Sequence, residues 1–106
     1  MQQQNERNRK GDVFLSVVII GGHERMEARY EEICKKYHCK AKIFTKMKTD
    51  LNHKIGDPDL MILFTSTASH KMVQCAVAKS EGGHTVLRRS HSSSANALIR
   101  ILENFV

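Results

Sequence analysis

The fold is decided by one stretch of the chain, Val13-Phe14-Leu15-Ser16-Val17-Val18-Ile19-Ile20-Gly21-Gly22. The residues before the glycine pair are rich in β-branched side chains and are interrupted only by Ser16. A strand that is apolar on both faces is typical of the centre of a parallel sheet, because helices cover both of its faces there. We therefore predict a buried strand over residues 13–20.

Helix-like and strand-like segments alternate outward from this strand. Amphipathic spacing predicts helices over residues 23–37, 69–79 and 92–105, with a short helix around 50–55. Apolar runs predict further strands over residues 41–47, 60–64 and 84–90. Such alternation gives a parallel sheet joined by right-handed crossovers. We predict an α/β fold, a small Rossmann-like three-layer sandwich whose four-stranded parallel sheet has the order 2-1-3-4 and helices on both faces.

Length and composition limit the class of protein. The chain has 106 residues and a net charge of +6. We predict a disordered polar leader over residues 1–12 and a single domain over residues 13–106. The longest apolar run is much shorter than the roughly 20 residues of a membrane span, and the polar N-terminus does not resemble a secretory signal. The three cysteines are an odd number and are predicted to be reduced, which favours the cytoplasm.

Polar residues gather where three of the predicted strands end. Ligands bind open parallel sheets beyond the carboxyl ends of the strands, at the point where the strand order reverses. The order 2-1-3-4 brings the segments after strands one, three and four to that point. The candidate ligand-binding residues are Gly21, Gly22, His23, Arg25, Ser66, Thr67, Ser69, His70, Arg89, Ser90, His91, Ser92 and Ser93.

These residue types favour an anionic ligand such as a phosphate or a nucleotide. Each segment precedes a helix, whose first backbone N–H groups and positive dipole end attract anions. Gly21 and Gly22 allow close approach of the backbone, and Arg25, Lys71 and Arg89 supply charge. His70 is predicted to orient the ligand or transfer a proton. The alternative is that the hydroxyls only cap helices and form turns.

Histidines allow a second interpretation of the same region. His23, His70 and His91 each follow a strand end, so together they are candidates to ligate a metal ion or haem iron. The alternative is that each is a solvated loop residue. A further metal set, Cys34, His38 and Cys39, has weaker spacing, and Cys34 is better explained as a core residue. The identity of any cofactor is left open.

A lysine-rich stretch supports a third hypothesis, nucleic-acid binding. It comprises Lys35, Lys36, Lys40, Lys42, Lys46, Lys48 and Lys54. Lysines also discourage the pairing of edge strands, and few aromatic residues accompany them, so a solvated edge is the alternative. A homodimer that covers an edge or a helix face is also expected. The sequence contains neither a phosphate-binding P-loop nor a recognisable nucleophile–base pair, so enzymatic activity is not indicated.

Four motifs resemble the DUF2325 family of small bacterial domains of unknown function. They are the stretch from Gly21 to Met26, residues 42–48, the stretch from Phe64 to Met72 and the stretch from Arg89 to Ser94, within a resemblance that covers Val17 to Leu102. The resemblance implies an α/β fold. In a more distant branch the first motif resembles Gly-Gly-Arg, which makes a shared three-histidine site less expected. The Ser69-His70 and Arg89-Ser90 steps recur in both branches, which draws attention to His70 and Arg89.

Overall fold

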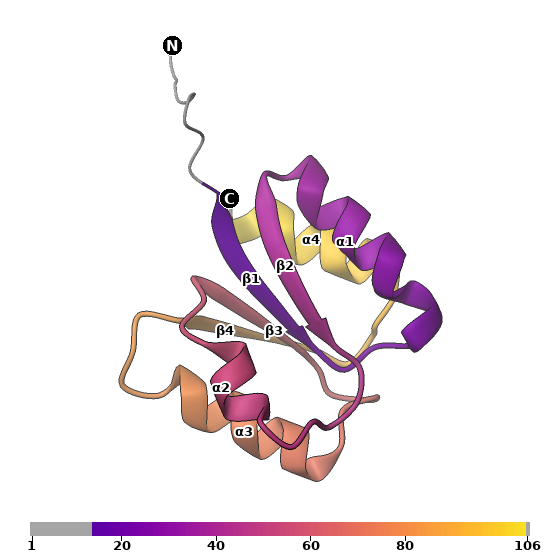
Figure 1. The fold of residues 1–106 in the computed structure, drawn as a ribbon. Helices are drawn as coiled ribbons and strands as arrows, with labels where there is room; N and C mark the ends of the chain where they lie inside the picture. Colours follow the sequence, from indigo (N-terminus) through magenta and orange to yellow (C-terminus); the bar gives the residue numbers. More distant parts are fainter. Residues whose placement is uncertain (1–13, 106) are drawn as a thin grey trace.

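A computed structural model describes residues 14–105. Its elements follow the order β1 (Leu15–Ile20), a 3₁₀ turn η1 (Glu24–Met26), α1 (Glu27–Lys36), β2 (Cys39–Phe44), α2 (Leu51–Ile55), β3 (Leu60–Phe64), α3 (His70–Ser80), β4 (Val86–Ser90) and α4 (Ala95–Phe105). The four strands form a parallel sheet in the order β2-β1-β3-β4, which confirms the predicted topology. Helices α1 and α4 cover one face, and α2 and α3 cover the other (Figure 1).

Two apolar clusters, one on each face of the sheet, form the core. Val17 and Ile19 point into the cluster under α1 and α4, whereas Val18 and Ile20 point into the cluster under α2 and α3. All residues of β3 are fully buried. Because successive side chains of a strand alternate between faces, the buried stretches Val17–Ile20 of β1 and Leu60–Phe64 of β3 need apolar residues at every position. This explains the run of sequence that predicted them.

The strands end nearly level with one another. Ile20 pairs with Phe44 of β2 and with Leu63 of β3, and Phe64 pairs with Ser90 of β4. The segments that follow the strands therefore all leave from one edge of the sheet. No helix within residues 14–105 has the length and apolarity needed to cross a lipid bilayer. The predicted polar leader, residues 1–12, lies outside the described residues.

Strand β2 differs most from its prediction. It covers Cys39–Phe44, so it begins and ends earlier than the predicted range 41–47. The chain reverses between α1 and β2 in a tight turn, because His38 adopts a left-handed conformation with φ 58°. Cys39 is therefore a buried strand residue, whereas Ile43 is only half-buried. A strand at the edge of a sheet lacks a neighbour on one side, which leaves its apolar residues partly exposed.

The other differences lie at element boundaries. The predicted helix 23–37 begins with the separate turn η1, and β4 begins at Val86 instead of at residue 84. Helix α4 begins at Ala95, later than the predicted residue 92, because Ser94 caps it: Ser94 Oγ accepts a hydrogen bond from the Ala97 N–H over 3.1 Å. Helix α3 starts as predicted, with Ser69 Oγ accepting from the Met72 N–H.

Candidate functional site

The point where the strand order reverses lies between β1 and β3. After β1 the chain turns to the α1 face of the sheet, and after β3 it turns to the α3 face (Figure 1). Open α/β sheets bind ligands at a switch point of this kind. We call the segments 21–25, 65–71 and 88–94 together the carboxyl rim, since they lie at the carboxyl ends of β1, β3 and β4.

Hydrogen bonds join the first two segments of the carboxyl rim. The Gly22 N–H donates to Thr67 Oγ1 over 2.7 Å, and Thr67 Oγ1 donates to the Phe64 carbonyl over 3.3 Å. Thr67 thus fixes the loop after β1 against the loop after β3. The Gly21 N–H is also held, by the Phe44 carbonyl at 2.9 Å.

The glycine pair is required by packing within the protein. Gly21 has φ +99°, and a Cβ there would lie 2.8 Å from the Phe64 carbonyl oxygen. Gly22 has φ +88°, and a Cβ there would lie 2.7 Å from the Tyr30 ring. Both glycines are buried. Close approach of a ligand to this backbone stays a prediction, while close approach of Phe64 and Tyr30 is what the structure describes.

The second and third segments of the rim are also bonded to each other. Ser66 Oγ donates to the His91 carbonyl over 2.6 Å, and the Thr65 N–H donates to the Ser90 carbonyl over 2.9 Å. Tyr30 Oη donates to the Ser93 carbonyl over 2.7 Å, which ties the last segment to α1. The structure therefore brings the three polar segments together, as the strand order predicts.

Several rim hydroxyls take part in caps and turns. Ser69 caps α3, Ser90 Oγ donates to the Ser92 carbonyl, and Ser92 Oγ donates to Ser94 Oγ. The capping interpretation is thus confirmed for Ser69. Sequence reasoning missed the cap at Ser94.

Exposed basic side chains surround these bonded segments. They are His23, Arg25, His70, Lys71, Arg88, Arg89 and His91. Within residues 14–105, none of these side chains forms an ion pair. The ion pairs in that part of the chain are formed by Arg29, Lys46 and His84. The rim therefore carries positive charge that no described acidic side chain neutralises through an ion pair.

Strand register places Arg89 on the α3 face of the sheet. Arg89 pairs with Leu63, and both Leu63 and Leu87 belong to the cluster beneath α2 and α3. His70, the first residue of α3, follows β3 on that same face, and its Nε2 lies 3.3 Å from Gln74 Nε2. His23 and Arg25 lie on the α1 side instead, and within the described part of the chain no hydrogen bond links them to the other two segments.

The histidine and cysteine sets gain no geometric support as metal sites. Within the described residues, no three His, Cys, Asp or Glu side chains are placed to hold a metal ion together. Burial raises the pKa of the Cys34 thiol to about 12 and also raises the pKa of Cys39. A metal ligand or nucleophile needs the thiolate, so these two buried groups are better explained as core residues. Metal binding by His23, His70 and His91 stays a prediction.

Comparison with known proteins identifies a family. The family model described as an uncharacterized protein conserved in bacteria (DUF2325) matches residues 16–105. No curated protein and no solved structure matches the chain significantly. The matched range begins in β1 and ends in α4, so it includes every segment of the carboxyl rim. The chain therefore belongs to the DUF2325 family.

Proposed function

We propose that this protein binds a small anionic ligand, phosphate-like or nucleotide-like, at the carboxyl rim. One observation carries the proposal: hydrogen bonds join three segments that are distant in sequence, at the point where the strand order reverses. The basic side chains around these segments form no ion pair with any described residue. The bonds hold the segments in place before a ligand arrives. A site that is already ordered loses less conformational entropy on binding.

Each segment would contribute a different kind of contact. Arg89 would be the charge partner, because a guanidinium can donate two parallel hydrogen bonds to a phosphate or carboxylate. The N-terminus of α3 would add backbone N–H donors and its dipole, since the Ser69 cap occupies the Met72 N–H and leaves those of His70 and Lys71 open. His70, at that helix end, would orient the ligand or exchange a proton with it.

Isothermal titration with ADP and with inorganic phosphate tests this assignment. Arg89→Ala should weaken binding of the probe by about tenfold or more, because a lost charge-assisted hydrogen bond costs about 1.5–3 kcal/mol. His70→Ala should weaken it as well. Arg100→Ala is the matched control, since Arg100 is exposed on α4, outside the rim. Equal binding in all of the variants, or unfolding of the two rim variants, would remove the assignment.

Native mass spectrometry of the protein, purified without chelator, separates this proposal from its alternatives. A metal or haem adduct lost on substitution of His23, His70 or His91 would favour the cofactor hypothesis. The same spectrum reports the oligomeric state, for which we keep the homodimer as a proposal because β4 is a sheet edge. We also propose a cytoplasmic location, which the free thiols of Cys34, Cys39 and Cys75 support.

A further inference from the structure

A trough follows the outer edge of β2 and ends beside Glu24, in the first segment of the carboxyl rim. Cavities of about 360, 380 and 320 Å³ lie in a row there. Glu31 and Ala41 line both the first and the second cavity, and Glu27 and Ile43 line both the second and the third. Within the described residues, β1 is the only strand that pairs with β2. The outward backbone groups of β2 are therefore available to another strand.

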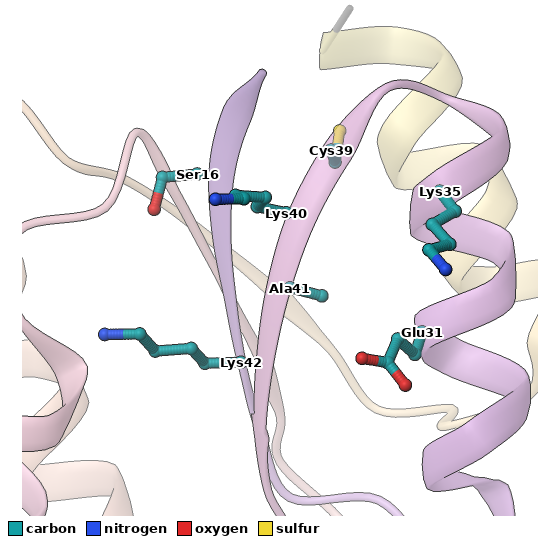
Figure 2. A pocket seen from close by; sticks show the side chains of 7 residues that line it. All are labelled: Ser16, Glu31, Lys35, Cys39, Lys40, Ala41 and Lys42. Atoms are coloured by element: carbon teal, nitrogen blue, oxygen red, sulfur yellow. The ribbon is translucent and has the colours of Figure 1, made fainter.

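The two faces of β2 differ in character along this trough. Ala41 and Ile43 are half-buried and face α1 across the cavities, whereas Lys40 and Lys42 are exposed on the opposite face. Figure 2 shows Glu31 and Lys35 on the α1 side of β2, with Lys40 and Lys42 reaching away from α1. Lys42 Nζ donates to the Lys54 carbonyl at the end of α2, over 3.2 Å, and so is held in place.

Charge argues against a second copy of the chain as the occupant. A two-fold axis through an antiparallel β2–β2 pair sets residues of the same face opposite one another. Lys40 and Lys42 would then face lysines of the other copy, and like charges directly opposite across strands are destabilising. The chain's own N-terminal residues 1–12 do not suit this edge either. Their basic residues Arg7, Arg9 and Lys10 outnumber Glu6 and Asp12, so their net positive charge would be repelled by the lysines of β2.

We propose that the β2 edge binds an extended acidic segment of a partner protein as an added strand. Backbone hydrogen bonds to β2 would supply affinity, and alternate side chains would supply specificity. Acidic residues would face Lys40 and Lys42, and apolar residues would pack on Ala41 and Ile43. β2 has six residues, which at roughly 3.3 Å per residue gives room for a partner segment about 20 Å long.

The test uses the whole protein and the synthetic peptide acetyl-Glu-Val-Glu-Val-Glu-Val-amide. Nuclear magnetic resonance titration should shift the amide signals of Lys40, Ala41, Lys42 and Ile43. It should slow the hydrogen exchange of Ala41 and Ile43, because backbone groups alternate along a strand and those of His38 and Phe44 already bond toward β1. Lys40→Glu should weaken binding by about threefold or more, as expected for loss of a cross-strand charge pair, and should let the corresponding Lys-Val peptide bind instead. Lys36→Glu is the matched control, because Lys36 is exposed on α1 and does not line the cavities.

A further measurement tests whether the backbone of the peptide takes part in binding. The Glu-Val peptide with alternate backbone nitrogens methylated keeps its charge but loses donors, so it should bind much more weakly. Equal binding of acidic and basic peptides, or protection along β4 instead of β2, would overturn the proposal. So would protection of β2 amides by dimerisation alone, or binding of a single-stranded RNA in place of the acidic peptide.

Discussion

The Gly22 N–H donates to Thr67 Oγ1 over 2.7 Å, which joins the loops after β1 and β3 across the point where the strand order reverses. The same hydroxyl donates to the Phe64 carbonyl, so one threonine links both loops to the end of β3. These loops lead to helices on opposite faces of the sheet. Without this bond the first segment of the carboxyl rim would lose its direct link to the second.

Thr67→Val should destabilise the protein by about 1–3 kcal/mol. Valine keeps the shape of the side chain but leaves the partly buried Gly22 N–H without its acceptor, and an unsatisfied donor of this kind carries a penalty of that size. Urea unfolding gives the free energy. Thr65→Val is the control: its hydroxyl is exposed and makes only a 3.5 Å contact with the Ser90 carbonyl, so a change within about 0.5 kcal/mol is expected. Equal effects would show that the bond to Gly22 is not important.

Gly22→Ala should destabilise the protein much more than Gly82→Ala. Both glycines have a positive φ, which costs an alanine about 1–2 kcal/mol. Only Gly22 adds a clash, because its Cβ would approach the Tyr30 ring to 2.7 Å, whereas a Cβ on Gly82 meets nothing within 4 Å. Thermal or urea unfolding of both variants isolates the packing contribution. Similar losses in the two would mean that Tyr30 moves aside easily.

Tyr30→Phe should loosen the segment 91–94. The substitution removes the 2.7 Å bond from Tyr30 Oη to the Ser93 carbonyl, and the expected loss of stability is about 1 kcal/mol. Amide hydrogen exchange should become faster in that segment, while β1 keeps its protection. Tyr37→Phe is the control, since the Tyr37 hydroxyl bonds to Glu103 at the exposed surface. Unchanged exchange in residues 91–94 after Tyr30→Phe would contradict a role for Tyr30 in holding the rim.

Stability should fall as the pH rises above about 9. Burial, followed by the neighbouring Cys39 and Glu31, raises the pKa of the Cys34 thiol from 9.0 to about 12. The folded state then holds a proton that the unfolded state releases between these two values, so its full stability is present below pH 9 and is lost as the pH increases toward 12. Urea midpoints at pH 8 and pH 10 measure this fall. Cys34→Ala should reduce it, and an equal fall in both proteins would assign it to other groups.

The fold followed from residues whose burial leaves a clear pattern. Val17 to Ile20 and Leu60 to Phe64 are apolar at every position because both faces of β1 and β3 are covered, and that pattern belongs to central parallel strands. The boundaries of β2 could not be predicted in the same way. They depend on the left-handed conformation of His38, which a residue other than glycine seldom adopts.

The position of the rim was predictable, but its internal bonding was not. Strand order alone brings residues 21–25, 65–71 and 88–94 to one edge. Which hydroxyl bonds to which loop depends on three-dimensional distances, so neither the Gly22–Thr67 bond nor the Ser66–His91 bond was foreseen. The glycine pair was expected to serve a ligand, whereas Phe64 and Tyr30 already account for the absence of side chains there.

The most direct test of the anion site is a ¹H–¹⁵N titration of the whole protein with ADP and with inorganic phosphate. We predict shifts in the amides of Gly21, Gly22, Thr67, His70 and His91, with little change along β2, and loss of those shifts in Arg89→Ala. Shifts confined to β2 or scattered over the lysines, or no shifts at millimolar probe, would contradict an anion site at the carboxyl rim.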